Sequence, residues 1–487
     1  MKTSRREFLQ TGAAVLPALA ACSEAVVDER PNILLAISDD QSFAHTSLAG
    51  DSVVKTPVFD RVAKNGVYFP NADCCTPSCT PARAVALSGQ HAWRLGEAGN
   101  LCNFMPEGMR LYTDILAEAG YEIGRIRKGW APGNFEAAGR DRNPAGPDSE
   151  SLERFLEALP EGKPFCFWFG TSDPHRPFDK GSGAAAGLNP DDVEVPGFLP
   201  DTPEVRNDIL DYYLEIQRFD REVGEALALL DKAGKLENTI VVITSDNGMA
   251  FPGAKTNLYD YGVRVPLAVQ WPAKVPAGRV VEDFVSFADF APTFLEAAGV
   301  SPETEMSGRS LLPILTSTAS GHIEPERSAT VVGRERHMQA RPDDAGYPMR
   351  AIRTDDYLYI RNYEPDRWPG GDPPHYADID LSPTMAMMIE RRDDPAIQPS
   401  FERCAGKRPA EELYAVRDDP YQLRNLAESE EHAEIREALA AEMQQRLAET
   451  GDARALGQPA PWDDYPYACG LKIRSGPDGR GLEGTPL

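Results

Sequence analysis

The sequence is short of basic residues and, beyond its first two dozen residues, contains no long apolar run. Its 487 residues include 50 Lys and Arg against 76 Asp and Glu, a net charge of −26. That charge argues against nucleic acid or an anionic membrane surface as the main partner. No segment after residue 22 approaches the roughly 20 apolar residues of a membrane span. An anionic ligand would need a local cationic pocket, because the overall field repels it.

The N-terminus has the features of an export signal. Ser4-Arg5-Arg6-Glu7-Phe8-Leu9 is a twin-arginine pattern, and a short apolar run follows it. Leu19-Ala20-Ala21-Cys22 is similar to a bacterial lipobox, with Cys22 as the lipid-bearing residue; the alternative is a plain signal peptide. We expect a signal peptide over 1–22 and a polar tether over 23–30. The product would be a periplasmic or cell-surface lipoprotein that touches the membrane only through Cys22.

The chain has eight cysteines, an odd number once Cys22 is set aside. In an oxidising compartment at least one of the other seven is then unpaired or chemically altered, and Cys79 is the leading candidate. The pairing among the rest stays open: Cys74, Cys75, Cys102, Cys166, Cys404 and Cys469.

Apolar runs that alternate with helical patterns predict an α/β domain with a largely parallel sheet over 31–325. The runs most typical of buried strands are 33–37, 165–169 and 239–244. After residue 326 the texture changes, with a hairpin pattern over 351–362 and a helical pattern over 431–450. We expect a smaller α+β domain with an antiparallel sheet over 326–487.

Oxygen-bearing side chains follow two of the predicted strands. Asp39 and Asp40 come after the first run, and Asp246 and Asn247 come after the third. An Asp-Asp pair alone more often marks a solvated loop. Two such strand ends together, without a His or Cys cluster, favour Ca²⁺, with Mg²⁺ as the alternative, over zinc.

Cys79 stands just before a predicted helix. Thr80 is the expected N-cap, Pro81 suits the first turn, and Ser88-Gly89 ends the helix. A nucleophile at this position could attack an anionic group whose oxygens the helix N-terminus holds. The alternative is a buried structural or disulfide-bonded cysteine.

With these pieces in place, the chain resembles the type I sulfatases. The likeness covers about residues 31 to 426, and Cys79-Thr80-Pro81-Ala82-Arg83 is similar to the signature in which Cys is oxidised to formylglycine. The resemblance implies an alkaline-phosphatase-like fold and a formylglycine-generating maturase as partner. It also implies calcium bound by Asp39, Asp40, Asp246, Asn247 and the modified residue 79, with sulfate contacts from Lys128, His175 and Lys255 and support from Arg83. Ala82, where the family more often has Ser, is a mild departure.

The resemblance also implies a mechanism. A hydroxyl of the hydrated formylglycine attacks sulfur to form a covalent sulfate intermediate, and the second hydroxyl then expels sulfate. Asp246 would be the base and His175 the acid for the leaving atom. Lys128, Lys255 and the cation would stabilise the sulfate oxygens.

Within the family the chain is similar to the heparan N-sulfatases, in stretches such as 173–176, 245–248, 256–259, 347–350 and 381–384. One departure is Trp130, which stands where the family has a His that holds the formylglycine hydrate; His91 or His45 are the candidates to replace it. A cationic and aromatic rim would select the sugar, with these candidate substrate contacts: His91, Arg334, Arg336, His337, Arg367, Trp368 and His375.

The leading hypothesis is hydrolysis of sulfate esters or sulfamates on a sulfated glycan, with N-sulfoglucosamine of heparan-type saccharides as substrate. Fragments of algal sulfated polysaccharides are the alternative substrate. A phosphodiesterase or phosphonate hydrolase on the same fold is a second reading. A third is a non-catalytic lipoprotein that binds sulfated glycans.

Overall fold

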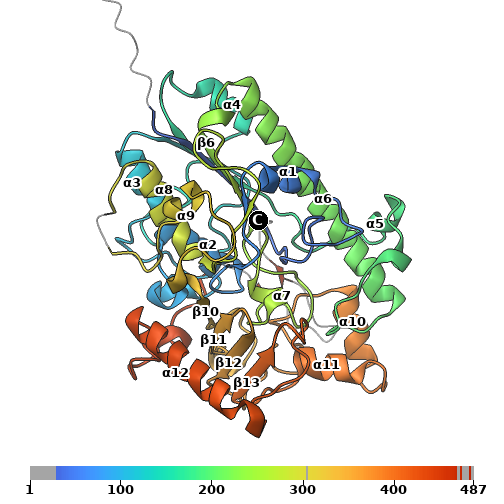
Figure 1. Cartoon of the computed structure of the whole chain (residues 1–487). Coiled ribbons are helices and arrows are strands. Elements are labelled where there is room, and N and C mark those ends of the chain that lie inside the picture. Colours follow the sequence, from blue (N-terminus) through green and yellow to red (C-terminus); the bar gives the residue numbers. More distant parts are fainter. Residues whose placement is uncertain (1–28, 303–304, 469–471, 474–481, 484–487) are drawn as a thin grey trace, which may run out of the picture.

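The computed structural model describes residues 29–302, 305–468, 472–473 and 482–483 (Figure 1). The expected signal peptide, the lipobox and Cys469 lie outside these residues. A seven-stranded sheet forms the centre of the molecule, in the order β4-β5-β1-β6-β7-β2-β8. Its strands are β1 Asn32–Ser38, β2 Val67–Tyr68, β4 Glu122–Ile126, β5 Phe165–Gly170, β6 Thr239–Ser245, β7 Leu267–Gln270 and β8 Arg279–Val280.

The four strands β4, β5, β1 and β6 run parallel, which confirms the largely parallel sheet expected from the apolar runs. Strand β1 is central, and all seven of its residues are buried. The direction reverses at β7, which pairs antiparallel with β6 and with β2. Because the parallel strands share one carboxyl edge, the residues after β1 and β6 lie side by side.

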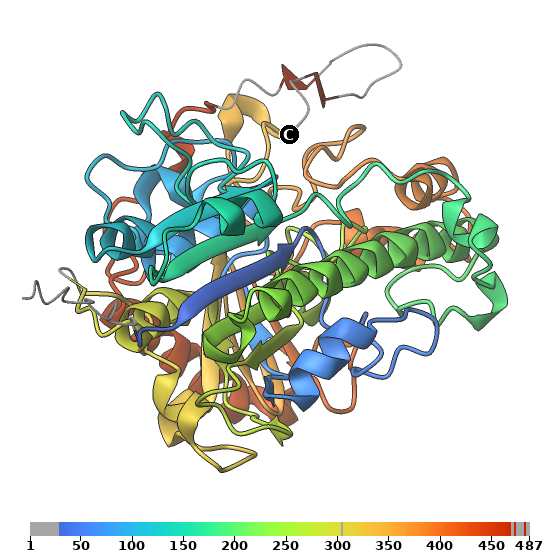
Figure 2. The ribbon, with the colours of Figure 1, turned by 90° about the horizontal axis from the view of Figure 1, so that it is seen from above.

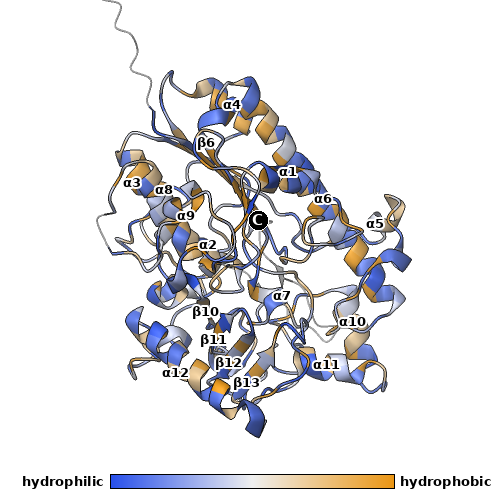
Figure 3. Ribbon diagram, in the orientation of Figure 1, coloured by the Kyte–Doolittle hydropathy of each residue, from blue (hydrophilic) through white to orange (hydrophobic). Residues whose placement is uncertain are grey.

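Helices cover both faces of this sheet (Figure 2). The side chains of β1 alternate between the two faces. Leu34 and Ala36 pack in the core with α1 Pro57–Lys64, α4 Leu152–Ala158 and α6 Pro203–Lys232. Ile33, Leu35 and Ile37 pack on the other face, with α2 Cys79–Ser88, α3 Tyr112–Glu118 and α8 Phe290–Ala297. The hydropathy colouring shows apolar residues concentrated in the central strands (Figure 3). Shortening such a buried Leu to Ala costs about 2–5 kcal/mol.

A second sheet of four strands lies below the first in Figure 1, in the order β10-β11-β12-β13. Its strands are β10 Ala329–Arg334, β11 Met349–Thr354, β12 Tyr357–Asn362 and β13 Glu411–Ala415, and each neighbouring pair is antiparallel. Helix α12 Ala433–Glu449 packs on it through Leu439, Met443 and Leu447. This helix confirms the helical pattern predicted over 431–450.

Short elements complete the described fold. They are β3 Ala72–Asp73, β9 Val285–Ser286, α5 Ser182–Ala185, α7 Asp260–Val263, α9 Leu312–Thr316, α10 Pro383–Glu390, α11 Gln398–Ala405, β14 Lys472–Ile473 and β15 Leu482–Glu483. Among the residues described, no helix combines the length and apolar character that crossing a bilayer requires.

Candidate active site

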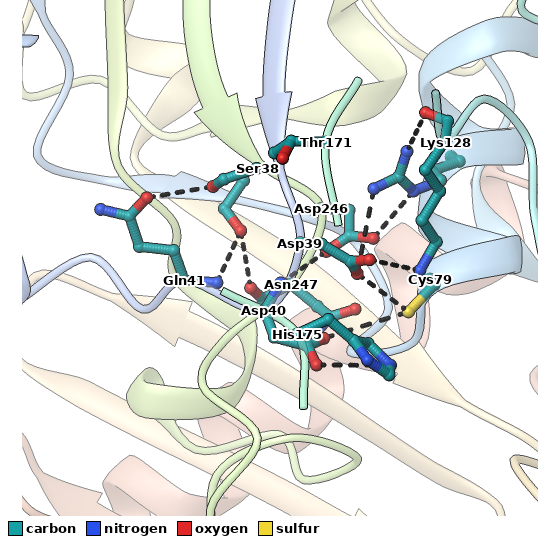
Figure 4. Close-up of polar contacts among 12 residues, drawn as sticks. Ser38, Asp39, Asp40, Gln41, Cys79, Lys128, Thr171, His175, Asp246 and Asn247 are labelled. Atoms are coloured by element: carbon teal, nitrogen blue, oxygen red, sulfur yellow. Dashed lines mark hydrogen bonds and ion pairs between the residues drawn. The ribbon is translucent and has the colours of Figure 1, made fainter. Parts of the chain in front are cut away.

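Acidic side chains gather where β1 and β6 end, as Figure 4 shows. Ligand atoms of Asp39, Asp40, Cys79 and Asp246 all lie within 4.8 Å of one another, and all four residues are buried. The backbone N–H of Asp40 donates to Asp246 Oδ1 at 3.0 Å, which ties the two strand ends together. Buried carboxylates this close repel one another unless cations lie among them.

Three cationic side chains surround the carboxylates. Lys128 Nζ lies 2.5 Å from Asp39 Oδ2, and Lys255 Nζ lies 2.7 Å from Asp40 Oδ2. Arg83 Nε donates to Asp246 Oδ2 at 2.8 Å, and its Nη1 donates to the carbonyls of Lys128 and Gly129. Burial opposes ionisation of Asp39, but Lys128, His175 and Arg83 together hold the pKa of this carboxyl well below its usual range.

Asp246 differs from Asp39 in its proton affinity. Burial, followed by the neighbouring charge of Asp39, raises the pKa of Asp246 to about 6, although Arg83 and Lys128 act against the rise. Without a bound cation, the pair therefore holds a proton more readily on Asp246 than on Asp39.

Cys79 is the first residue of α2, whose N-cap is Ser78. The expectation that Thr80 caps this helix is wrong: the Thr80 hydroxyl instead contacts the carbonyl of Pro132. Cys79 Sγ lies 3.5 Å from Asp39 Oδ1 and 4.0 Å from Asp40 Oδ1. Burial raises the pKa of the Cys79 thiol well above its usual range, so an unmodified Cys79 is a neutral thiol. The helix ends at Ser88, followed by a left-handed Gly89, as the sequence indicates.

His175 approaches the cluster from the loop after β5. Its Nε2 lies 3.9 Å from Asp40 Oδ2. Its Nδ1 lies 2.6 Å from the carbonyl oxygen of Arg176, an acceptor only, so Nδ1 carries a hydrogen. Nε2 is then the atom free to give or take a proton on the side of the cluster.

Asn247 supplies the observation that tests whether a cation fits here. Its Nδ2 donates to Asp40 Oδ1 at 2.7 Å, while its Oδ1 is buried and has no hydrogen-bond partner among the described residues. A buried amide oxygen without a donor is costly, and a cation ligand would satisfy it. Carboxylate and amide oxygens are ligands for hard cations such as Ca²⁺ and Mg²⁺. The residues present therefore fit a divalent cation at this position.

Trp130 belongs to the core and not to the cluster. Its side chain is fully buried and packs close to Gly133, and in the part of the chain that the structure describes its indole Nε1 has no hydrogen-bond partner. Neither candidate replacement contacts the described cluster residues. His45 contacts Asp51, Tyr213 and Met249. His91 stacks on Trp93 and lies near Cys75.

One predicted rim residue, in the loop after β10, lies beside the cluster. His337 Nδ1 lies 2.8 Å from the hydroxyl of Ser78, directly before Cys79. Burial, despite the nearby charge of Asp378, lowers the pKa of His337 to about 3, so the ring is neutral. Ser78 was not recognised in the sequence as a site residue.

Other predicted rim residues are engaged elsewhere. Arg334 is buried, with Nη1 on the carbonyl of Thr256 and Nη2 on Asp378. The buried Arg336 donates to the carbonyls of Tyr465 and Pro466. Arg367 is half-buried and bonds Gly346 and Asp463, and His375 is exposed. Of these four, Arg334 and Arg336 have guanidinium groups committed to the protein itself.

Two acidic residues near the site were missed by the sequence reasoning. Asp378 accepts from Arg334 Nη2 and from the backbone N–H of Met338, and its Oδ2 forms an ion pair with Arg341 Nη1 at 2.9 Å. Asp380 Oδ2 lies 3.4 Å from Lys255 Nζ. They belong to an Asp-Ile-Asp sequence in a Pro- and Gly-rich loop, a pattern without a metal or catalytic signature of its own.

The described cysteines are mostly free. Cys74, Cys75, Cys79, Cys166 and Cys404 are free thiols, all buried. Cys102 is disulfide-bonded. The expectation that at least one cysteine outside Cys22 stays unpaired is confirmed.

The carboxylate cluster at the edge of the parallel sheet fits a cation, and the helix-start cysteine and two lysines beside it can bind an anionic group. The family described as Sulfatase matches residues 31–300, and the one described as N-sulphoglucosamine sulphohydrolase, C-terminal, matches 254–369. The chain belongs to the sulfatase family, whose members are sulfuric ester hydrolases.

Similar proteins agree with this membership. N-sulphoglucosamine sulphohydrolase of Homo sapiens is 30% identical over 472 residues, covering 86% of this chain and 90% of that protein. An ulvan-active sulfatase of Formosa agariphila is 26% identical over 484 residues, covering 88% and 77%. A structure solved in complex with its substrate D-glucosamine-2-N,6-O-disulfate superposes with a TM-score of 0.64 at 20% identity, covering 87% and 98%.

Proposed function

We propose that this sulfatase removes the N-linked sulfate from N-sulfoglucosamine units of heparan-type saccharides. One observation supports sulfate transfer at this site: Cys79 Sγ lies within 4.0 Å of two carboxylates that are each paired with a lysine. The choice of substrate is supported by the C-terminal family match and by the human relative.

We further propose that Cys79 is converted to formylglycine by a maturase. Its Sγ then marks the place of the formylglycine oxygens, and hydrated formylglycine supplies a geminal diol as nucleophile. A calcium ion, held by Asp39, Asp40, Asp246, Asn247 and residue 79, would supply charge stabilisation and an acidified hydroxyl.

The protein's own residues do the remaining work. Lys128 and Lys255 pair with the two carboxylates that lie beside Cys79, and they bind the sulfate oxygens, where their charge counts most in a buried site. Asp246, held by Arg83, accepts the proton of the attacking hydroxyl. His175 gives the proton on Nε2 to the leaving nitrogen, because its Nδ1–H stays on the carbonyl of Arg176.

The export signal and the lipid anchor at Cys22 stay part of the proposal. They place the enzyme in the periplasm or at the cell surface, where a sulfated saccharide would reach it. Labelling with a fatty acid analogue tests the anchor: wild type should carry the label, and Cys22→Ala should not.

The central experiment co-expresses the chain with a formylglycine-generating maturase. Mass analysis of the peptide that contains residue 79 should find the aldehyde, and an unmodified thiol in an active enzyme would overturn the formylglycine step. Sulfate release is then measured from N-sulfoglucosamine, N-acetylglucosamine 6-sulfate, ulvan oligosaccharides and a phosphonate monoester. N-sulfoglucosamine should be hydrolysed best, and a preference for any of the others would replace the proposed substrate.

A further inference from the structure

Tertiary contacts hold Asp380 in place, but its carboxylate does not itself support the described fold. Two residues earlier, Asp378 is anchored by Arg334, Arg341 and the backbone of Met338. Two residues later, the Ser382 hydroxyl accepts from Met385 N–H at 2.9 Å and caps α10. The backbone on both sides of Asp380 is therefore fixed by tertiary contacts, and its side chain is preorganised.

Asp380 faces the sulfate site from the side of the smaller sheet. Its Oδ2 lies 3.4 Å from Lys255 Nζ, which also contacts Asp40 Oδ2 at 2.7 Å. The Asp380 side chain is 24% exposed, whereas that of Asp40 is fully buried. Asp380 therefore contacts the same lysine as the cation cluster and is more exposed to solvent than Asp40.

The carboxylate of Asp380 is ionised. Burial opposes ionisation, but Lys255 and His175 outweigh it and hold the pKa of Asp380 at about 2. Its ion pair with Lys255 is long and shares that lysine with Asp40. Among the residues that the structure describes, no other side chain donates a hydrogen bond to it, so it retains acceptor capacity for a ligand.

A carboxylate beside a sulfate site needs a chemical reason, since it repels sulfate. The reason follows from its neighbours. In the proposed mechanism His175 acts on the leaving atom through Nε2, which lies 3.9 Å from Asp40 Oδ2. Lys255 Nζ lies 2.7 Å from that same oxygen and 3.4 Å from Asp380 Oδ2, so His175 and Asp380 approach the same part of the site. Asp380 thus lies on the side from which the leaving group departs, where a hydrogen-bond donor and not an anion has to be held.

We propose that Asp380 is a specificity residue that accepts a hydrogen bond from the leaving nitrogen of an N-sulfated amino sugar, an inference that rests on the proposed function. When the S–N bond breaks, nitrogen keeps the electron pair and takes a proton from His175. Sulfur gains the oxygen of the attacking formylglycine hydroxyl, whose proton passes to Asp246, and the second hydroxyl would then expel sulfate and restore the aldehyde, which water rehydrates. The released amine takes up, through solvent, the proton that Asp246 gives back and becomes ammonium. A carboxylate stabilises the N–H donor and, more strongly, the ammonium product. The leaving oxygen of an aryl sulfate offers no such donor.

The test compares wild type, Asp380→Asn and a control, Asp366→Asn, which removes an exposed carboxylate of the same loop. The mature enzymes are assayed on N-sulfoglucosamine and on 4-nitrophenyl sulfate, whose ring carries no hydroxyl group. We expect Asp380→Asn to lower kcat/KM for N-sulfoglucosamine by about 10- to 100-fold, and to change that for the aryl sulfate less than about threefold. The control should match wild type on both.

A second readout is inhibition of aryl sulfate hydrolysis by glucosamine, with N-acetylglucosamine for comparison. Wild type should be inhibited more by glucosamine, and Asp380→Asn should lose at least about tenfold of that inhibition. Asp380→Ala repeats both measurements if the Asn variant does not fold. Equal losses on both substrates, or unchanged glucosamine inhibition, would overturn the role of Asp380. Wild type that is active only on the aryl sulfate would instead overturn the proposed substrate.

Discussion

Two groups of buried carboxylates meet at this site, and they differ in how their charge is balanced. Asp39, Asp40 and Asp246 stand at strand ends, share two lysines and an arginine, and lie beside an amide oxygen without a donor. Asp378, in the loop from the smaller sheet, is matched by two arginines and a backbone N–H. The first group is arranged for a cation and a substrate, and the second holds the fold together. The partners of an acidic residue close to an active site therefore show whether it binds a ligand or stabilises the fold.

The largest expected effect comes from removing Cys79, the reactive residue that lies beside the first group. Cys79→Ala should lower turnover by at least about 10⁴-fold, because no other residue can supply the nucleophile. The melting temperature should stay within about 2 °C of wild type. Cys404→Ala is the matched control. Cys404 is also a buried free thiol, but it belongs to helix α11 and packs in a different core. An active Cys79→Ala enzyme would refute the mechanism.

Breaking the second group should damage stability instead. Asp378→Asn leaves Arg334 buried and facing Arg341 without the charge that balances them. We expect a loss of about 3–5 kcal/mol in the free energy of unfolding, measured by urea denaturation. Cation binding by the folded fraction should not change. Loss of calcium affinity with full stability would show that Asp378 belongs to the first group.

Calcium binding sharpens the comparison from the other side. Calcium at 100 times its dissociation constant should add about 2.7 kcal/mol to the free energy of unfolding, and EDTA should remove this gain. Differential scanning fluorimetry would follow it as a rise of a few degrees in melting temperature. Asp40→Asn should abolish the rise, whereas Asp366→Asn should preserve it. A rise that survives Asp40→Asn would place the cation elsewhere.

Asp73 provides the case of a buried carboxylate that neither group contains. Burial raises its pKa to about 7 from an ordinary 3.8. The folded state keeps this proton up to about pH 7, but the unfolded chain releases it near pH 4. The unfolded state therefore binds fewer protons, and this group makes the free energy of unfolding fall as the pH rises from 4 to 7.

Asp73→Asn should remove that dependence. Its amide oxygen can still accept from the Cys75 N–H, which now donates to Asp73 Oδ1 at 2.8 Å. At pH 8 the variant should be more stable than wild type by roughly 2 kcal/mol, and the gain should vanish near pH 4. Urea denaturation across this pH range measures it. A gain that does not depend on pH would mean that Asp73 is ionised throughout.

The residues of the cation cluster could be predicted because they follow apolar runs. Runs 33–37 and 239–244 are too apolar for anything but buried strands, and parallel strands bring their carboxyl ends to one edge. The sequence therefore predicts that four oxygen-bearing side chains lie together at this edge of the sheet: Asp39, Asp40, Asp246 and Asn247. The helix after Cys79 was expected for a similar local reason, although its N-cap is Ser78 and not Thr80.

The contributions of the smaller sheet could not be predicted in this way. Arg334 and Arg336 look like a cationic lip in the sequence, yet both are buried and bound to the protein's own acceptors. Asp380 carries no local signal, and only the docking of its loop brings it to Lys255. Charge in a sequence shows what a residue can bind, and tertiary packing determines whether it binds the protein or a ligand.

Sequence alone determined the position of residue 79 at a helix start, because Pro81 and Gly89 act on their own few residues of backbone. It also determined which strands carry the cation ligands. The tertiary structure decided what lies opposite them. It brings lysines to Asp39 and Asp40, the neutral His337 to Ser78, and the carboxylate of Asp380 to Lys255. These contacts join residues far apart in the chain, so no local pattern encodes them, and the burial and charge of the assembled site set their chemistry.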